Sequence, residues 1–385
     1  MSGNWNYPTA VRFGVGRAQE IGAACKELGM KKPLLVTDPG LAKLPMISAA
    51  VASCTAAGLD CGVFSNIKPN PVGENVEDGV AIYRANGHDG VIAFGGGSGL
   101  DAAKAIALMA GQSGNVFDYE DAGDNWTLVK PEGVAPIVAV PTTSGTGSEV
   151  GRASVITDAA NHVKKIIFHP KMMPSIVIAD PELTVGLPAH ITAATGMDAL
   201  SHNLEAYCSP FYHPMAEGIA VEGIRLVKEY LPTAVRDGND LVARSQMMIA
   251  STMGATAFQR GLGGMHALAH PLGALYDAHH GLLNAILMPY ILIGNRPEIE
   301  DRIARLSSFI GLEEANFDDF LQWVLDLRQQ VKIPNDLGAI NIDAEKATLV
   351  GQMAVEDPSS GGNPIALTAE EYTDVFLKAV NGDLD

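Results

Sequence analysis

The chain has 385 residues, of which 47% are hydrophobic and 18% are charged, so it is too long for one small module and too apolar to be disordered. Its 26 basic and 44 acidic residues give a formal net charge of −18, without any run of basic residues. This argues against nucleic-acid binding, which depends on cationic charge meeting phosphate. The longest apolar runs, such as residues 285–294, fall short of the about 20 residues needed to cross a bilayer, so we expect no membrane span.

The start of the chain and its cysteines bear on the compartment. Residues 1–8 have neither a basic start nor an apolar core, so we expect no secretory signal. The four cysteines lack the spacing of a metal or redox motif, and we expect them to be reduced thiols: Cys25, Cys54, Cys61 and Cys208. Both features favour a cytoplasmic protein.

Residues 1–185 alternate short apolar runs with helical stretches. Four runs rich in Val, Ile and Leu are typical of buried parallel strands: 33–38, 90–94, 135–140 and 175–179. Between them, residues 18–28 and 100–109 have helical spacing and good helix formers. We therefore predict an α/β domain over residues 1–185, with its ligand crevice at the carboxyl ends of the strands.

A glycine-rich segment near the start, residues 14–19, partly resembles the G-x-G-x-x-G dinucleotide motif. Gln19 stands where the third glycine belongs, and the strand signal before it, residues 10–13, is short and contains a charge. We therefore do not place a phosphate here.

Asp38 ends the first of the four predicted strands. A carboxylate at this point can accept hydrogen bonds from both adenosine ribose hydroxyls and repels a 2′-phosphate, which favours NAD over NADP. An exposed turn residue before Pro39 and Gly40 explains the same sequence equally well.

Two polar loops follow the next predicted strands. Gly95, Gly96, Gly97 and Ser98 lie between a strand and a helix expected to begin near residue 100, where bare backbone lets a phosphate approach unpaired N–H groups. The second loop, residues 141–149, carries five hydroxyl groups and two glycines. Each loop alone can be a turn without a ligand, but the pair favours a dinucleotide.

From residue 186 onward the sequence changes character. Long amphipathic or apolar stretches predict helices at 190–207, 215–230, 241–258, 281–294, 299–309 and 317–330. We therefore predict a second, all-helical domain over residues 186–385.

Histidines gather in the second domain. His266 and His270 are spaced i, i+4 on one helical face, and His280 lies too far along a straight helix to share an ion with His266. Pro271 and Gly273 are expected to interrupt that helix, so that the chain turns back and brings His280 near His266.

Asp198 and His202 form a second i, i+4 pair, inside an otherwise apolar helix. A buried carboxylate is costly unless it is paired or ligated. One Asp and three His suit a divalent transition metal, and we interpret Asp198, His202, His266 and His280 as such a set. The alternative for each histidine is a hydrogen-bonded core or surface residue, which is our reading of His88, His162, His169, His190 and His213.

These motifs resemble those of the iron-containing, or group III, alcohol dehydrogenases, essentially from end to end. The resemblance rests on Gly95 to Ser98 with Asp101 and Lys104, on the loop 141–149, on residues 196–202, and on residues 266–273 with His280 and Gly281. It implies a nucleotide-binding α/β domain and an all-helical metal-binding domain, with NAD(P) and the metal in the cleft between them. It also implies a homodimer.

The resemblance also implies roles for individual residues. Asp198, His202, His266 and His280 match the metal ligands, with Fe²⁺ expected first and Zn²⁺ or Ni²⁺ as alternatives. His270 matches a histidine near the metal, and we expect it to relay the hydroxyl proton. The positions that match the cofactor site are Asp38, Asn70, Gly96, Gly97, Ser98, Thr142, Thr143, Thr146, Lys164 and Leu183.

Two departures from the family pattern bear on the site. Residues 258–263 differ from an Asn-containing stretch of many members beside the substrate pocket. His279 stands where Pro is common, so two adjacent histidines compete for the metal, and we choose His280.

The expected reaction interconverts a small alcohol and its aldehyde or ketone by hydride transfer with NAD(P). One alternative is a polyol or glycerol dehydrogenase-like enzyme, or another metal-dependent enzyme on this scaffold that handles an anionic substrate. Such a substrate calls for a Lys and Arg cluster, whereas only Arg260 lies near the histidines in sequence. A second alternative is a non-catalytic nucleotide or metal sensor. The sequence does not name the alcohol.

Overall fold

The computed structural model describes residues 7–161 and 163–384. Residues 1–6, on which most of the expectation about a secretory signal rests, and His162 lie outside this range. The described chain divides into two compact units. An α/β unit comprises residues 7–143 and 147–185, and a helical unit comprises residues 144–146 and 186–384.

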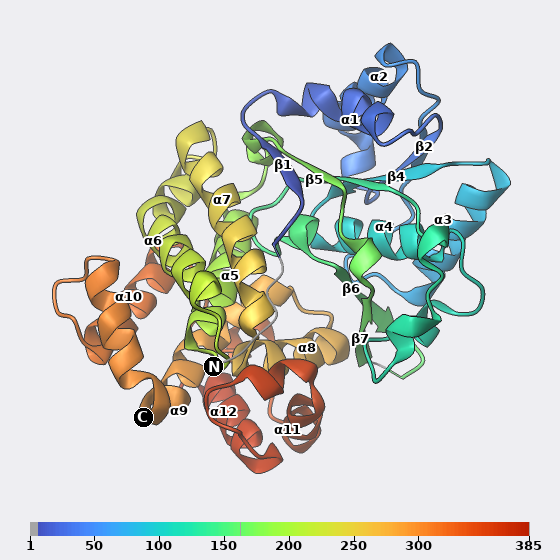
Figure 1. The fold of residues 1–385 in the computed structure, drawn as a ribbon. Coiled ribbons are helices and arrows are strands. Elements are labelled where there is room, and N and C mark those ends of the chain that lie inside the picture. Colours follow the sequence, from blue (N-terminus) through green and yellow to red (C-terminus); the bar gives the residue numbers. More distant parts are fainter. Residues whose placement is uncertain (1–6, 162, 385) are drawn as a thin grey trace. The chain divides into compact units, whose positions relative to one another are not determined.

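Six strands of the described chain form one parallel sheet, in the order β1-β8-β5-β4-β2-β3 (Figure 1). The strands are β1 (Ala10–Phe13), β2 (Pro33–Val36), β3 (Gly62–Phe64), β4 (Gly90–Gly95), β5 (Ile137–Pro141) and β8 (Ile176–Ala179). Strands β2, β4, β5 and β8 are buried at every position, as their apolar sequences predict for parallel strands covered on both faces.

Helices cover both faces of the sheet (Figure 1). One face packs against α1 (Ile21–Glu27) and α2 (Pro45–Ala56) through side chains such as Leu35, Phe94 and Val138. The other face carries α3 (Gly73–Ala85) and α4 (Gly97–Met109). The predicted α/β architecture is confirmed.

The strand order changes direction at β2. The chain passes from β2 to β3 on one side, and then returns to place β4, β5 and β8 on the other side. In open parallel sheets this switch point, at the carboxyl ends of the two flanking strands, is where ligands bind. Asp38 follows β2, and the glycine turn, which we define as Gly95 to Ser98, lies at the end of β4. Both therefore flank the switch point.

A short antiparallel hairpin, which the sequence analysis did not predict, extends the α/β unit. It consists of β6 (Ala153–Asp158) and β7 (Val163–Phe168). Thr157 of β6 also donates its N–H to the carbonyl of Pro71 (2.7 Å), which ties the hairpin to the segment after β3.

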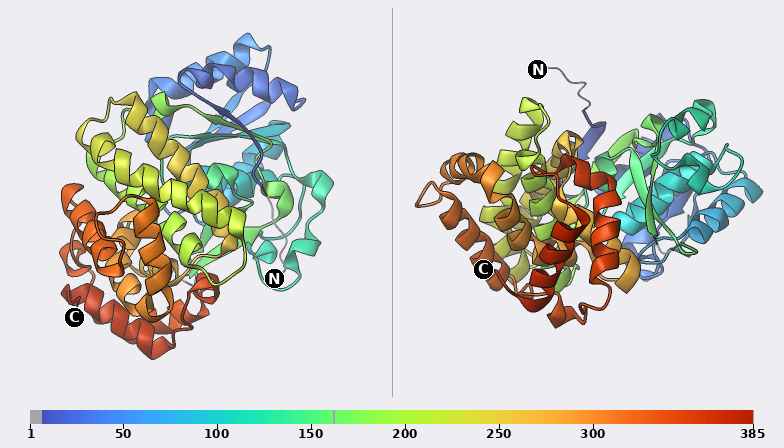
Figure 2. Two further views of the ribbon diagram at one scale, coloured as in Figure 1. Left: turned by 60° about the vertical axis from the view of Figure 1, so that its left-hand side comes forward. Right: turned by 90° about the horizontal axis from the view of Figure 1, so that it is seen from below.

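The helical unit is built around α5 (Ala189–Cys208), whose residues from Thr192 to Cys208 are all buried. Helices α6, α7 and α9 pack against it (Figure 2). The other helices are α6 (Pro214–Arg236), α7 (Leu241–Ala257), α8 (Gly264–Tyr276), α9 (His280–Phe309), α10 (Phe317–Gln330), α11 (Ala347–Glu356) and α12 (Ala369–Asn381). No helix of the described residues combines the length and apolar character needed to cross a membrane.

The structure corrects two expectations about helix ends. The predicted helices 281–294 and 299–309 form one helix, α9, which continues through Pro297. Leu292, Ile299 and Ile303 lie on one face at helical spacing and are all buried, so packing outweighs the one hydrogen bond that a proline removes.

The second correction concerns α8, which runs through Pro271 and Gly273 instead of stopping there. The helix ends at Asp277, whose backbone is left-handed at φ 51°. This conformation suits a short polar side chain, and it turns the chain back toward the start of α9.

Candidate active site

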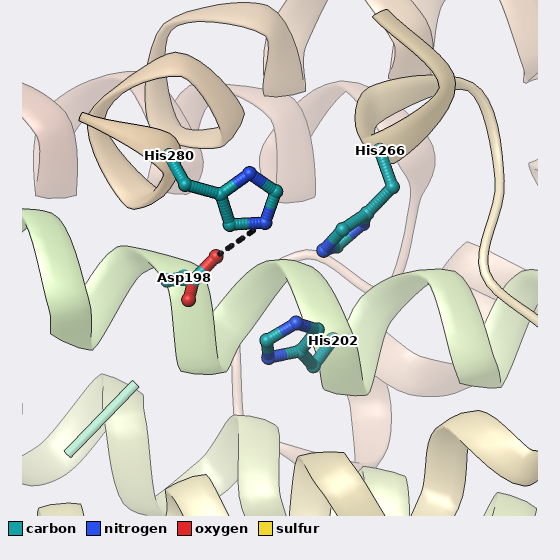
Figure 3. A group of neighbouring side chains, drawn as sticks. All are labelled: Asp198, His202, His266 and His280. Atoms are coloured by element: carbon teal, nitrogen blue, oxygen red, sulfur yellow. Dashed lines mark ion pairs between the residues drawn. The ribbon is translucent and has the colours of Figure 1, made fainter. Parts of the chain in front are cut away.

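Four polar side chains converge inside the helical unit, and we call them the polar cluster: Asp198, His202, His266 and His280 (Figure 3). Each offers one oxygen or nitrogen atom, and these atoms all lie within 4.8 Å of one another. The distance from His280 Nε2 to Asp198 Oδ1 is 3.9 Å. The first two residues come from α5, the third from α8, and the last is the first residue of α9.

Close packing of α9 against α5 makes this convergence possible. A Cβ atom at Gly281 would lie 2.6 Å from the carbonyl oxygen of Ala194 and 2.9 Å from Cβ of Asp198. Real Cβ contacts do not reach these distances, so the bare backbone of Gly281 lets His280 approach Asp198.

In two histidines of the polar cluster, Nδ1 forms a hydrogen bond to a group outside the cluster. His202 Nδ1 donates to the carbonyl of Gly145 at 3.2 Å, and His266 Nδ1 donates to a carboxylate oxygen of Glu205 at 2.6 Å. A carbonyl or carboxylate oxygen only accepts, so both rings carry their hydrogen on Nδ1 and keep Nε2 as a lone-pair donor. Burial lowers the pKa of His266 well below its usual range, which keeps this ring neutral.

Glu205 is a buried carboxylate that the sequence analysis did not identify. One of its oxygens accepts from the backbone N–H of Met265 (2.6 Å), and the other accepts from Gly263 N–H (2.8 Å) and from His266. Burial raises the pKa of Glu205 to about 7, although the backbone donors oppose that shift.

Asn284, one turn after His280 on α9, faces the same polar cluster. Its Nδ2 lies 2.9 Å from Asp198 Oδ1, 3.1 Å from His266 Nε2 and 3.2 Å from His280 Nε2. Two hydrogens cannot serve three acceptors, and the buried Oδ1 of Asn284 finds no hydrogen-bond partner among the described residues. The Asn284 amide therefore cannot satisfy these three acceptors together.

A metal ion would use the lone pairs that the Asn284 amide leaves over. One carboxylate oxygen and three imidazole nitrogens suit a divalent transition metal. Asp198 is 1% exposed, and ligation would compensate the cost of burying its charge. The residues of the polar cluster therefore fit a metal ion.

His270 lies beside the polar cluster, with its ring stacked on that of His280 at a centroid distance of 5.3 Å. Its Nδ1 lies 2.8 Å from Asp357 Oδ2. Burial alone would raise the pKa of Asp357, but His270 and hydrogen bonds from Ser359 hold it below its usual range. The carboxylate keeps the hydrogen of His270 on Nδ1 and leaves Nε2 as the atom that can exchange a proton.

His279 faces elsewhere. Its Nδ1 accepts from the N–H of Leu282 at 3.3 Å, and so caps the start of α9. The side chain also lines a separate hollow of about 850 Å³, whose walls come from α5, α6, α9 and the segment after α10. The geometry thus brings His280, and not His279, to the polar cluster.

The α/β unit places the glycine turn at the start of α4. This helix begins at Gly97, earlier than expected, so the N–H groups of Gly97 and Ser98 belong to its unpaired first turn. The preceding residue, Gly96, provides no side-chain cap, and Gly95 has φ 152° in the region that favours glycine. Such an open helix terminus attracts an anion.

Three other predicted cofactor residues lie near this turn. Thr142 follows β5 and donates its N–H to the carbonyl of Gly95 at 2.9 Å. Thr143 is next to Gly96, where a Cβ would lie 3.2 Å from its methyl group. Asp38 uses Oδ1 to accept from the N–H groups of Gly40 and Leu41, so its turn role is real, while Oδ2 has no hydrogen-bond partner among the described residues.

The remaining predicted cofactor residues are more dispersed. The Ser98 hydroxyl donates to the carbonyl of Pro69, directly before Asn70. Lys164 lies on β7 opposite Thr157, which bonds to the residue after Asn70. Leu183 packs against the sheet core, and Thr146 belongs to the helical unit.

Two residues of the family motif, Asp101 and Lys104, hold a loop in place. Lys104 is 1% exposed, lies 3.3 Å from Asp101, and donates to the carbonyls of Ser148 (3.0 Å) and Ala153. Burial lowers the pKa of Lys104, and Asp101 opposes that shift. The buried Lys104 and the partly buried Asp101 together fasten the end of the loop 141–149 to α4.

In the motif-like segment 14–19, a protein carboxylate takes the place of a phosphate. Its backbone N–H groups at Gly16 and Ala18 donate to the two carboxylate oxygens of Asp180, at 3.2 and 2.8 Å. A side chain of the protein therefore occupies the position at which an anion would otherwise bind.

Three polar residues of the site escaped the sequence analysis. Glu205 lies three residues after His202 and seven after Asp198, so helical spacing on an apolar helix could have identified it. Asn284 lies one turn after His280 and could have been found in the same way. Asp357 is 87 residues from His270, and no spacing rule connects the two.

Comparison with known proteins places both units in one family. The sequence profile described as iron-containing alcohol dehydrogenase matches residues 8–181. The profile described as Fe-containing alcohol dehydrogenase family, C-terminal, matches residues 192–380.

Individual relatives match over nearly the full chain. The NAD-dependent methanol dehydrogenase of Bacillus methanolicus is 34% identical over 384 residues, covering 98% of this chain and 100% of that protein. The 4-hydroxybutyrate dehydrogenase of Cupriavidus necator is 38% identical, covering 95% and 97%. The crystal structure of a 1,3-propanediol oxidoreductase superposes with a TM-score of 0.94 at 35% identity, covering 98% and 100%.

Proposed function

The chain belongs to the iron-containing alcohol dehydrogenase family, and from this premise we propose that the polar cluster holds the metal ion at which its substrate reacts. The enzyme interconverts an alcohol and an aldehyde or ketone by hydride transfer with NAD(P). The single observation that carries the proposal is the convergence of four ligand atoms, largely buried, within 4.8 Å of one another.

Asp198, His202, His266 and His280 would hold the ion. When bound, a divalent ion acts as a Lewis acid that lowers the pKa of an alcohol hydroxyl. Fe²⁺ is the first expectation, and Zn²⁺ and Ni²⁺ suit the same donors, since geometry and supply select among them.

His270 takes the role of proton acceptor in alcohol oxidation. Its Nδ1 hydrogen is held by Asp357, so the hydroxyl proton is taken up at Nε2 and passes on to solvent. Asp357 also stabilises the positive charge that the ring then carries. In aldehyde reduction the same atom returns the proton.

The cofactor is bound by the α/β unit. Gly96, Gly97 and Ser98 offer their backbone to the pyrophosphate at the start of α4. Asp38 offers Oδ2 to the adenosine ribose, which favours NAD over NADP. We assign lining roles to the other matched residues: Asn70, Thr142, Thr143, Thr146, Lys164 and Leu183.

The substrate that we propose is a small alcohol. Relatives are named for methanol, 4-hydroxybutyrate and 1,3-propanediol, each of which carries a primary hydroxyl group. A cytoplasmic homodimer, as the resemblance implies, is part of the same proposal and is tested by light scattering and cell fractionation.

An anionic polyol substrate is disfavoured by Arg260. Its guanidinium donates to the carbonyls of Phe211 and Tyr207 and to the carboxylate of Glu217, at 2.7 to 3.1 Å. A group so fully engaged in the fold is not available to bind a phosphate.

The decisive experiment is anaerobic purification with metal analysis, followed by a panel of alcohols and aldehydes with NADH and NADPH. We expect about one divalent ion per chain and aldehyde-dependent NADH consumption. The Asp198→Ala variant should lose both the ion and the activity. Full turnover by a metal-free variant would contradict the proposal, and binding of NADH without any turnover would support a sensor instead.

A further inference from the structure

We propose that Glu205 is a positioning residue for the metal centre, which holds His266 in the ligating tautomer and supplies a second negative charge to the site. The inference rests on the proposed metal function of the polar cluster. Glu205 touches no substrate or ion in this proposal; it acts through its hydrogen bond to His266 and through its charge.

The hydrogen bonds around Glu205 require a carboxylate. Three donors face its two oxygens: the backbone N–H groups of Gly263 and Met265, and Nδ1–H of His266. A carboxylate accepts from all three, and no group that can also donate fits this environment.

The bond to Glu205 is the shorter of the two hydrogen-bond contacts of the His266 ring, 2.6 Å against 3.1 Å to Asn284. The distance of 2.6 Å is short for a nitrogen donor, as expected for a charge-assisted hydrogen bond. The ring is 1% exposed, so water cannot replace this partner. Nε2 of His266 therefore points into the polar cluster in one fixed orientation.

Charge gives the second part of the argument. Asp198 is the sole anionic side chain of the polar cluster, so a bound divalent ion would leave a net charge of +1 in a buried site. Glu205 is 4% exposed and lies against the ring of a ligand. When ionised, Glu205 brings the summed charge of the ion, Asp198 and Glu205 to zero.

His202 and His266 differ in the charge of the group that accepts their Nδ1 hydrogen. His202 donates Nδ1–H to a neutral carbonyl, at 3.2 Å, whereas His266 donates to a carboxylate. A carboxylate partner makes the imidazole a stronger electron donor, and outer partners of this kind are typically worth about 10–100-fold in metal affinity. We therefore expect His266 to be the stronger nitrogen ligand of the two.

The test is Glu205→Gln, which keeps the shape of the side chain. The Gln amide removes the negative charge and places its NH₂ against Met265 N–H, or, if it is turned over, against Gly263 N–H and Nδ1–H of His266. Either orientation weakens the contact that holds the His266 ring. We expect the affinity for Co²⁺, measured by competition with a chelator, to fall about 10–100-fold, with a changed visible spectrum of the bound ion.

The matched control is Asn363→Ala. Asn363 Oδ1 accepts from the N–H of Gly264, at the same end of α8, but does not contact His266. If Glu205 only caps the helix, both variants should weaken Co²⁺ binding equally, and this result would overturn the proposal. We expect Asn363→Ala to lower the melting temperature and to leave Co²⁺ affinity within about threefold, a factor that corresponds to less than 1 kcal/mol.

A second variant keeps the test falsifiable. If Glu205→Gln does not fold, Glu205→Asp takes its place, since it keeps both oxygens but withdraws them by one methylene group. Wild-type Co²⁺ affinity in the folded Glu205 variant, together with loss of the ion in Asp198→Ala, overturns this inference alone. Retention of the ion in Asp198→Ala overturns the proposed function.

Discussion

The sites proposed in the helical unit and in the α/β unit use different parts of the chain. The polar cluster is made of side chains from three helices, and three of them, Asp198, His202 and His266, are buried. The glycine turn is made of backbone at the start of α4, where the absence of side chains is the essential property. A side-chain site therefore fails when atoms are removed, whereas a backbone site fails when atoms are added.

The largest expected effect is on the helical side of this comparison. His202→Ala removes a ligand atom, and we expect loss of the bound ion and a fall in kcat of about a thousandfold or more, since a metal ion supplies several kcal/mol to such reactions. Metal analysis and NADH-coupled assays measure both. His190→Ala, an exposed histidine on the same helix, is the control and should change neither. NADH binding should survive in both variants.

Adding atoms to the glycine turn should weaken NADH binding and leave the metal content unchanged, the opposite of the result expected for His202→Ala. In Gly96→Val, the new Cβ lies 3.2 Å from Thr143, and the valine methyl groups obstruct the approach of the pyrophosphate. Loss of a charge-assisted hydrogen bond of about 1.5–3 kcal/mol should raise the Kd for NADH about 10–100-fold. Fluorescence titration of NADH measures the Kd. Metal content should remain at the wild-type value, and a joint loss of metal and cofactor would contradict the separation of the two sites.

Asp38 allows a finer test, because it combines a turn role with the proposed ribose role. Asp38→Asn keeps an oxygen for the N–H groups of Gly40 and Leu41 but removes the charge, and should reduce the preference for NAD over NADP about tenfold. Asp38→Ala removes both functions. If Asp38→Asn retains the wild-type ratio of kcat/KM for the two cofactors, Asp38 serves only the turn.

The smallest expected effect is on the free energy of unfolding, which should depend on pH through the His270–Asp357 pair. The pKa of Asp357 is lowered in the folded protein, so its stabilising contribution is present above the usual Asp pKa of about 3.9 and is lost as pH falls through the lower folded value. Asp357→Asn should reduce the free energy of unfolding by about 1 kcal/mol at neutral pH. Denaturation between pH 7 and pH 3 should show the gap to wild type closing toward the acid end. A gap that stays constant with pH would contradict this assignment.

Sequence patterns predicted the parts of the fold that are locally encoded. The runs at 33–38, 90–94, 135–140 and 175–179 correspond to β2, β4, β5 and β8, because buried parallel strands must be continuously apolar. The patterns failed where packing overrides a local signal, as at Pro271 and Pro297, which remain inside helices. The hairpin of β6 and β7 was missed, although both strands are rich in β-branched residues.

The candidate site likewise contains residues that local sequence patterns predict and residues that depend on tertiary packing. Asp198 and His202, or His266 and His270, are visible as i, i+4 pairs. The resemblance to a family implies that Asp198, His202, His266 and His280 are the ligands and that His270 lies beside them. Which of His279 and His280 turns toward the polar cluster depends on a left-handed residue and on a glycine that permits close contact, and neither effect is written in spacing alone. The pairing of His270 with Asp357 depends on tertiary structure and could not be predicted from sequence.

The origin of the polar cluster on three separate helices has a consequence for folding. Residues from 198 to 280 converge only after α5, α8 and α9 have packed, so an unfolded chain offers no comparable site. An ion that binds only the folded state stabilises it by mass action, by about 4 kcal/mol when its concentration is a thousand times its Kd. The ion would thus act as a reversible cross-link, and the melting temperature of the helical unit should rise with metal concentration.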